Sequence, residues 1–398
     1  MRILLWGEQT IHTVRLARSL LDRGHSVIAF DGCLLHENLA NEFGKSCEFV
    51  RIRHSVVKPR RLEAVRRLNA FLRRRAISRA LEHVQADVAH LNYLSHELVL
   101  FAVRDGERVP YVATAWGSDL NNEYFAKTST EWRSVGEVVK RAAFITADST
   151  ELLQRCRDLA PERSIGDFRL VFWGVEEQFF RGDEVQRAAE EWRNRLQIPL
   201  GDFLILSPRQ TRPQYNIELI LEGFAKSKGS QKSWLIFKLH GSPEEQEFGH
   251  RLLARASALG VASRVKLVER CAYRELAGLY RAATLGVSVP PVDGTPATFF
   301  EFMAVGTPLV VSGIPAYRDV VRHGHTGWCI DHLDSQGLGA SFDKLLEEPA
   351  TRQHIAETAR RWVQHFASWE DSVQRFEDLY KSAVACRTGS CLSSAGRS

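Results

Sequence analysis

Two acidic residues in the last third of the chain flank a turn sequence. Asp293 and Glu301 are separated by seven residues, which include Gly294, Thr295 and Pro296. The segment 288–311 is predicted to form a buried strand, a turn, a helix and a second buried strand. Pro296 suits the first helical turn, because the N–H that proline lacks is not needed there. This arrangement places Asp293 at the end of a strand and Glu301 about one turn into a helix.

The start of this predicted helix is a candidate anion site. The backbone N–H groups of Ala297 and Thr298 have no partner within the helix, and the helix dipole favours negative charge at this end. A diphosphate suits such a position, and the Glu301 carboxylate could then accept from two ribose hydroxyls. The alternative is that Asp293 forms an Asx turn and Glu301 only solvates a helix. The spacing and the Gly-Thr-Pro turn together favour ligand binding, and Gly294 and Thr295 are expected to contact the substrate.

The elements around this segment belong to an alternation of short apolar runs and longer amphipathic stretches. Such an alternation predicts parallel sheets covered by helices on both faces. It breaks over a charged stretch and restarts at Phe203, which predicts an α/β protein with two Rossmann-like domains facing a cleft. The expected parts are an N-terminal domain over 1–180, a linker over 181–202, a C-terminal domain over 203–368, a helix over 369–385 that packs back on the N-terminal domain, and a disordered tail over 386–398.

The composition excludes several classes of protein. Of the 398 residues, 44% are hydrophobic and 25% charged, with a net charge of +5 that is too small to indicate nucleic-acid binding. The seven cysteines form no C-x-x-C pair and no zinc spacing, which suits a reducing cytoplasm. Apolar runs are too short for a membrane span. The opening stretch 1–7 is expected to be a buried strand rather than a signal peptide.

The segment 288–311 resembles the signature of the family 4 retaining glycosyltransferases. In that family an acidic residue, seven further residues and a glutamate precede a Gly-Thr-Pro-Val-Val run. Here Asp293, Glu301 and the stretch 306–311 hold those places, with Asp where Glu is frequent. The resemblance implies the GT-B fold and transfer with retention at the anomeric carbon. It also implies a nucleotide-sugar donor in the C-terminal domain and a glycan, lipid-linked or small-molecule acceptor on the N-terminal side.

The loop after the first strand of the C-terminal half extends the resemblance. The family carries an Arg there and, about five residues later, a Lys, and both hold the donor diphosphate. Arg209 matches the first, whereas Gln214 and Tyr215 fall where the Lys is expected, and Arg212 is the nearest cation. A guanidinium suits phosphate because it binds through two N–H groups at once. The resemblance therefore gives Arg209 a catalytic role beside Asp293, and Arg212 a role in donor binding.

Two loops of the N-terminal half complete the predicted site. Trp116-Gly117-Ser118-Asp119 resembles the family's His-Gly-x-Asp element, with Trp in place of His. Trp116 is expected to contact substrate, and Asp119 to orient the donor sugar or the acceptor, although Asp119 could instead cap a helix. The loop that starts at Gly7 is expected to face the cleft and contact the acceptor or the sugar. Glu8 and His12 are weaker candidates in that loop.

The sequence contains no Asp-x-Asp pair, the pair that a metal-dependent transferase would use under the diphosphate. We therefore expect a metal-independent reaction with no cofactor beyond the nucleotide sugar, in which arginines and the helix start stabilise the leaving group. The alternatives are a nucleotide-sugar epimerase or phosphorylase on the same fold, and a non-catalytic relic that binds sugar nucleotides. A dinucleotide oxidoreductase is disfavoured because the first turn lacks G-x-G-x-x-G.

The stretch 51–79 contains eleven Lys or Arg residues and a single acidic residue, Glu63. This pattern predicts either an Arg-coated helix packed on its own sheet or a patch that contacts anionic lipid at the inner membrane face. Nucleic acid is not expected, because the stretch lacks a series of interleaved aromatic residues for base stacking. The lipid alternative is compatible with a lipid-linked acceptor.

Overall fold

The computed structural model describes residues 1–7, 10–31, 33–34, 41–53, 56–58, 63–120 and 128–387. The chain divides into two compact units, called here unit 1 (Met1–Val171 with Ser372–Ser398) and unit 2 (Phe172–Asp371). Glu8, Arg60, Arg61 and the tail from 388 lie outside the described residues. Residues 386 and 387, which the sequence assigned to the tail, still belong to the last helix.

Unit 1 is built on a parallel sheet of seven described strands in the order β3-β2-β1-β4-β5-β6-β7. The order reverses direction between β1 and β4, which makes this pair the topological switch point. The inner strands are almost wholly buried, as expected for parallel strands covered on both faces, whereas the edge strands β3 and β7 are partly exposed. Their bounds are β1 (Arg2–Gly7), β2 (Ser26–Phe30), β3 (Cys47–Val50), β4 (Val88–Asn92), β5 (Tyr111–Thr114), β6 (Phe144–Ala147) and β7 (Phe168–Leu170).

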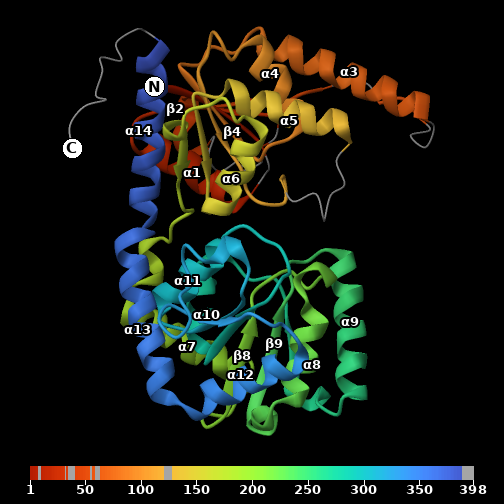
Figure 1. Cartoon of the computed structure of the whole chain (residues 1–398), viewed down its shortest axis with the longest axis vertical. Coiled ribbons are helices and arrows are strands. Elements are labelled where there is room, and N and C mark those ends of the chain that lie inside the picture. The colour runs from red at the N-terminus through yellow and green to blue at the C-terminus, as the bar shows by residue number, and fades with distance from the viewer. Residues whose placement is uncertain are drawn as a thin grey trace. The chain divides into compact units, whose positions relative to one another are not determined.

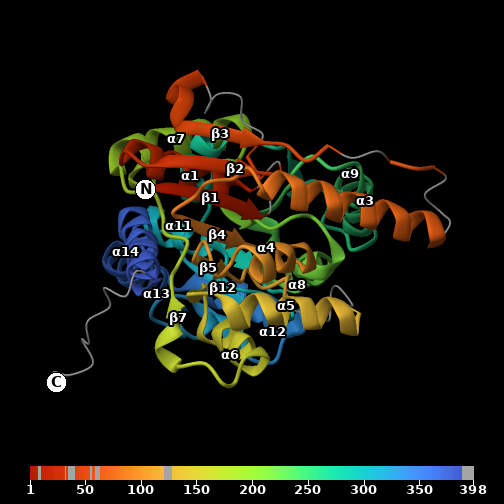
Figure 2. The same ribbon diagram turned by 90° about the horizontal axis from the view of Figure 1, so that it is seen from above.

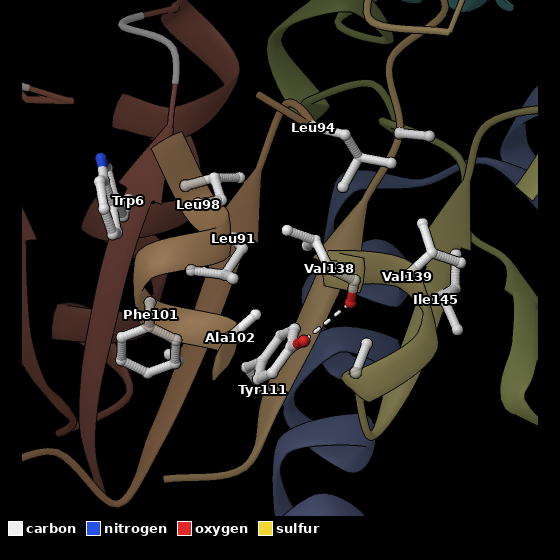
Figure 3. Packing of buried hydrophobic residues seen from close by; sticks show 14 of the residues in the cluster. Trp6, Leu91, Leu94, Leu98, Phe101, Ala102, Tyr111, Val138, Val139 and Ile145 are labelled. Atoms are coloured by element: carbon white, nitrogen blue, oxygen red, sulfur yellow. Dashed lines mark hydrogen bonds between the residues drawn. The ribbon is translucent and has the colours of Figure 1, made fainter. Parts of the chain in front are cut away.

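The described helices of unit 1 cover this sheet (Figure 1). They are α1 (Ile11–Asp22), α3 (Glu63–Leu81), α4 (Val99–Arg104), α5 (Ser129–Arg141), α6 (Thr150–Leu159) and the part of α14 (Trp369–Arg387) from Ser372 on. Apolar side chains of β4, α4, β5 and α5 form one core cluster. Within it, the Tyr111 hydroxyl donates to the Val138 carbonyl at 2.7 Å, so this buried polar group is satisfied (Figure 3).

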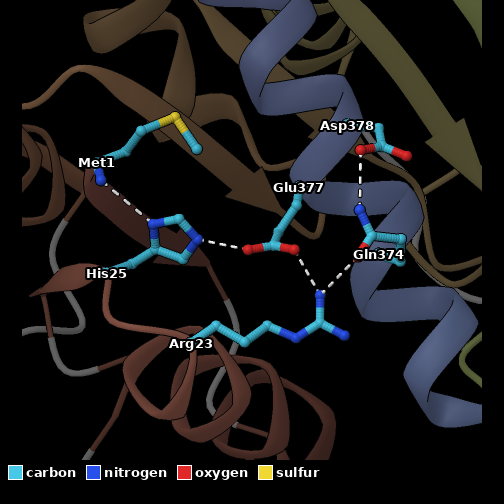
Figure 4. A network of polar contacts seen from close by, with 6 residues as sticks. All are labelled: Met1, Arg23, His25, Gln374, Glu377 and Asp378. Atoms are coloured by element: carbon cyan, nitrogen blue, oxygen red, sulfur yellow. Dashed lines mark hydrogen bonds and ion pairs between the residues drawn. The ribbon is translucent and has the colours of Figure 1, made fainter.

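The C-terminal helix α14 is fixed to unit 1 by polar contacts (Figure 4). Its Glu377 carboxylate accepts from Arg23 and lies 2.5 Å from Nε2 of His25, and His25 Nδ1 lies 3.2 Å from the terminal amine of Met1. Further along the helix, the Tyr380 hydroxyl lies 2.6 Å from Nδ1 of the buried His90 on β4. The contacts join the last helix to the first strand, the turn after α1 and the sheet interior.

Unit 2 contains a parallel sheet of six described strands in the order β10-β9-β8-β11-β12-β13. The switch point lies between β8 and β11. The strands are β8 (Phe203–Ser207), β9 (Ser233–Lys238), β10 (Val265–Val268), β11 (Leu285–Ser288), β12 (Leu309–Ser312) and β13 (Trp328–Ile330). The helices are α7 (Gly182–Arg195), α8 (Ile217–Lys226), α9 (Pro243–Ala258), α10 (Leu276–Ala282), α11 (Ala297–Val305), α12 (Ser335–Glu347) and α13 (Pro349–Phe366). The two sheets confirm the prediction of two Rossmann-like domains.

The stretch predicted as a linker over 181–202 is mostly the helix α7, and it belongs to unit 2. Its apolar residues Val185, Ala189 and Trp192 are buried. Gly278 of α10 allows a close approach here, because a Cβ at that position would lie 2.6 Å from the Cβ of Ala188. The high charge of this stretch therefore reflects the exposed face of an amphipathic helix rather than a hinge.

Candidate active site

The loops after β8 and β11 bring Arg209 and Asp293 together at the switch point of unit 2. Arg209 Nη2 lies 2.9 Å from Asp293 Oδ2, and the two side chains are 13% and 17% exposed. The guanidinium also lies over the ring of Tyr215, 4.4 Å from its centroid. The hydroxyl of Tyr317 donates to Asp293 Oδ2 at 2.9 Å. The ion pair is thus held in place by two tyrosines at the edge where ligands of such sheets bind.

This environment keeps Arg209 charged. Burial alone would lower the pKa of the Arg209 guanidinium, but the neighbouring Asp293 carboxylate and the Tyr215 and Tyr317 hydroxyls raise it above its ordinary value. Burial raises the pKa of Asp293, while Arg209, Tyr317 and the Gly294 N–H oppose that effect by stabilising the carboxylate. Asp293 therefore orients the Arg209 guanidinium and balances its charge before a ligand binds.

Helix α11 begins beside this pair and carries the predicted anion site. Pro296 is the N-cap and Ala297 the first helical residue, one position later than the sequence suggested, and no side chain caps the helix. The Thr298 hydroxyl is buried and has no hydrogen-bond partner in the described part of the chain. The backbone N–H groups at this uncapped helix start and the Thr298 hydroxyl can therefore donate to a ligand.

Glu301 lies one turn into α11 and is 3% exposed. The alternative in which it only solvates a helix is therefore wrong. The hydroxyl of Tyr280 interacts with its carboxylate, and the Tyr280 ring stacks on Phe302 with centroids 4.4 Å apart. Glu301 thus has an internal partner that holds its orientation, a contact that the sequence did not reveal.

Gly294 and Thr295, predicted to contact substrate, also shape the loop through internal hydrogen bonds. The Thr295 hydroxyl is buried and donates to the Ala316 carbonyl at 3.0 Å. The Gly294 N–H donates to Asp293 Oδ1 at 3.1 Å. Both hydrogen bonds are internal. They hold the turn between β11 and α11 in shape and attach it to the segment that carries Tyr317.

Three further polar groups lie at or just after the carboxyl ends of β8 and β9. Nε of Arg212 is buried with no hydrogen-bond partner among the described residues. The ammonium of Lys238, at the carboxyl end of β9, lies 3.2 Å from Nε2 of His240. The sequence interpretation missed Lys238. The available signal was a single charged residue at the end of an otherwise apolar parallel strand, where side chains reach the ligand edge.

In unit 1, Asp119 holds the loop that follows β5. It is fully buried, and its carboxylate accepts from the backbone N–H groups of Leu94 at 2.8 Å, Trp116 at 3.0 Å and Gly117 at 2.9 Å. The donors described for this carboxylate precede Asp119 in the chain, whereas the donors that a helix cap would use follow it from residue 121 on, outside the described residues. The carboxylate positions the two loops that end β4 and β5.

Gly7 and Trp116 meet at Asn92, at the switch point of unit 1. A Cβ at Gly7 would lie 1.5 Å from the Asn92 carbonyl oxygen, so only glycine permits this approach of β1 to β4. The Trp116 indole N–H donates to the Asn92 side-chain oxygen, and the indole ring lies 5.6 Å from that of His12. Burial and the adjacent Arg15 lower the pKa of His12 to about 3, so its ring is neutral near pH 7. Asn92 was not predicted.

A hollow of about 440 Å³ lies elsewhere in unit 2, at the other end of α11. Three arginines line it, and each donates to backbone carbonyls: Arg281 to Gly306 at 3.4 Å, Arg352 to Leu346 at 2.8 Å and Arg360 to Phe180 at 2.9 Å. These charges stabilise chain segments that already lie in place. The Arg209 site is therefore the stronger candidate.

Two Rossmann-like parallel-sheet units, each with a topological switch point, form the GT-B fold of glycosyltransferases. Two family models match the chain: glycosyltransferase family 4 over residues 9–165 and glycosyl transferases group 1 over residues 188–362. Together they cover most of unit 1 and unit 2. The protein belongs to family 4 of the glycosyltransferases.

Named relatives agree with this assignment. A D-inositol 3-phosphate glycosyltransferase of Thermomonospora curvata is 25% identical over 401 residues, 95% of this chain and 91% of the relative. One of Catenulispora acidiphila is 26% identical over 246 residues, 60% of this chain and 56% of the relative. The structure of Anabaena HepE with UDP-glucose has the same fold, with a TM-score of 0.77 at 17% identity over 96% of this chain and all of HepE.

Proposed function

We propose that this enzyme transfers a sugar from a nucleoside-diphosphate sugar to an acceptor hydroxyl, with retention at the anomeric carbon and without a divalent metal ion. The observation that carries the proposal is the Arg209–Asp293 ion pair beside the uncapped start of α11, with Glu301 one turn further in. In this assignment Glu301 accepts from the donor ribose. The diphosphate binds to the N–H groups of Ala297 and Thr298 and to the guanidinium of Arg209.

The chemistry that this arrangement supports is stabilisation of a leaving group. As the bond between the anomeric carbon and the phosphate oxygen breaks, negative charge grows on the leaving diphosphate. Arg209 and the helix start then bind that charge more strongly than in the ground state. The acceptor oxygen bonds to the same face of the anomeric carbon, and its proton passes to the leaving diphosphate. Asp293 orients Arg209, and Arg212 supplies a further cation.

We assign acceptor binding to unit 1. The groups that support this assignment are Trp116 and Gly7 at the switch point, where Asn92 fixes the indole. Asp119 is a positioning residue, because its carboxylate accepts hydrogen bonds from backbone N–H groups of the loops after β4 and β5. The acceptor is a glycan, a lipid-linked sugar or a small polyol. The relatives named for D-inositol 3-phosphate make that compound one acceptor to screen first.

The proposal is tested by ligand stabilisation followed by product analysis. UDP, GDP and ADP, and their sugar conjugates, are screened for a rise in melting temperature, since a ligand that binds the folded state stabilises it by mass action. The donor so identified is then incubated with candidate acceptors, and the product linkage is read by NMR. A product with the donor's anomeric configuration supports the proposal. Inversion, or donor turnover to an epimer or a sugar phosphate, overturns it.

We further propose that helix α3 contacts anionic membrane surfaces. Its amino-terminal part extends away from the rest of unit 1 in both views (Figures 1 and 2). On this helix Leu68 is 44% exposed and Phe71 is 59% exposed, and the helix also carries the exposed residues Arg66, Arg67, Arg74 and Arg75. Exposed apolar side chains among arginines match an interface with anionic headgroups. No helix in the described part of the chain is long and apolar enough to cross a membrane.

A further inference from the structure

Lys238 is a buried cation in unit 2 that the proposed donor contacts do not use. It ends β9, and β9 pairs with β8 so that Phe237 lies opposite Ser207. Lys238 and Arg209 therefore lie at the carboxyl ends of adjacent strands, at the same edge of the sheet. The residue is 5% exposed, and a buried ammonium is costly unless its charge is compensated.

The protein itself compensates this ammonium poorly. In the described part of the chain its one hydrogen-bonding contact is Nε2 of His240, at 3.2 Å, and no carboxylate pairs with it. The same Nε2 lies 3.3 Å from the Pro208 carbonyl oxygen. The ring nitrogen can thus accept from the ammonium only when it does not donate to that carbonyl. At least two of the three ammonium donors have no described partner.

Besides the Cys271 thiol, two carboxylates act on Lys238, and both are engaged elsewhere. Glu245 accepts from the backbone N–H groups of Thr211 at 3.0 Å and His240 at 3.2 Å. The Glu301 carboxylate interacts with the Tyr280 hydroxyl. These two carboxylates act on Lys238 through space, and burial still lowers the pKa of its ammonium. The position is therefore open to an anion from outside the chain.

The surroundings indicate which anion fits. The Thr211 hydroxyl donates to the Lys238 carbonyl at 3.2 Å, which ties the end of β9 to the loop that carries Arg209 and Arg212. That loop has Gln214 and Tyr215 where a donor-binding lysine was expected. We propose that Lys238 is a third cation for the donor diphosphate, beside Arg209 and Arg212, and that it reaches the diphosphate from the neighbouring strand in place of the absent loop lysine. This inference rests on the proposed function of the Arg209 site.

The test pairs nucleotide affinity with stability. The substitution Lys238→Met keeps an unbranched side chain of similar length and removes the ammonium charge. Calorimetry with UDP, GDP and ADP, whichever the wild type binds, should show a loss of affinity of roughly 10- to 100-fold. The corresponding nucleoside, which lacks phosphate, should bind as before. The ligand-free variant should melt at the same temperature as wild type or higher, because an uncompensated buried charge is gone.

Lys232→Met is the matched control, since it removes an exposed lysine just before the amino end of the same strand. It should leave nucleotide affinity unchanged. Unaltered diphosphate affinity in Lys238→Met, or an equal loss for the nucleoside, would overturn the inference. A wild type that binds none of the three diphosphates would overturn the proposed function itself, and this inference with it.

Discussion

At the scale of single residues, the donor site depends on charges whose partners are already in place. Arg209 has Asp293, and Glu301 has the Tyr280 hydroxyl. Such preorganisation means that ligand binding need not reorient these groups, which is what favours stabilisation of developing charge. It also means that removing one member leaves the other buried and unsatisfied, so variants must keep the shape of the side chain.

For Glu301 the informative change is therefore Glu301→Gln. A neutral amide keeps the volume and a hydrogen-bonding oxygen but loses the charge, and charge-assisted hydrogen bonds are roughly twice as strong as neutral ones. We expect nucleoside diphosphate affinity, measured by calorimetry, to fall about 5- to 20-fold. Tyr280→Phe serves as the control, because it removes the internal partner but not the carboxylate. If Glu301→Gln binds nucleotide like wild type and only its melting temperature falls, the carboxylate is structural.

At the scale of elements, α3 is anchored at one end and exposed at the other. Ile77 and Leu81 are buried, whereas Leu68 and Phe71 are exposed. Arg73 lies in between and pairs with Asp31 at 2.5 Å and with Glu97 at 2.6 Å. These contacts hold the helix to unit 1, and its residues Arg66, Arg67, Arg74 and Arg75 are exposed. The exposed half therefore suits contact with a charged surface.

This contact predicts salt-sensitive membrane binding. The wild-type protein should sediment with vesicles of mixed phosphatidylcholine and phosphatidylserine at low salt and be released at high salt, because screening weakens surface attraction. Replacing Phe71 with Ser should reduce the bound fraction. Ile165→Ser, which removes another exposed apolar residue of unit 1, should not. Equal sedimentation with purely neutral vesicles would contradict the electrostatic part of the proposal.

At the scale of the whole molecule, Glu377 attaches the last helix, α14, to the rest of unit 1. Burial alone would raise the pKa of the Glu377 carboxyl, but hydrogen bonds from His25 and Arg23 bring it below its ordinary value. A carboxylate with a lowered pKa in the folded state contributes stability above its unfolded pKa of about 4.3, and this contribution is lost as pH falls through the folded pKa. Acid should therefore loosen the attachment of α14.

Glu377→Gln tests this directly. At pH 7 the variant should unfold in urea with a free energy lower by about 1–3 kcal/mol, because two hydrogen-bonded partners lose a charged acceptor. Below the folded pKa of Glu377 the variant and wild type should converge. Asp378→Asn, an exposed neighbour on the same helix, should match wild type throughout. A difference that persists at low pH would show that the Glu377 effect is not ionic.

The reaction as a whole should not need a metal ion. The sequence has no Asp-x-Asp pair, and Arg209 with the start of α11 offers positive charge where a divalent ion would otherwise bind the diphosphate. Turnover with the identified donor and acceptor should persist in excess EDTA at the rate seen without it. Loss of activity in EDTA that manganese restores would overturn this expectation.

The sequence determined the features that arise from neighbours along the chain. Apolar periodicity predicted both parallel sheets, and the spacing from Asp293 to Glu301 predicted a strand end followed by an uncapped helix, since turn and cap chemistry act within a few residues. Only the tertiary structure decided which distant groups meet these elements. Tyr280 reaches Glu301, Tyr317 reaches Asp293, and Lys238 lies at the same sheet edge as Arg209. Strand order in the sheet creates these contacts, and strand order results from packing that no local pattern encodes.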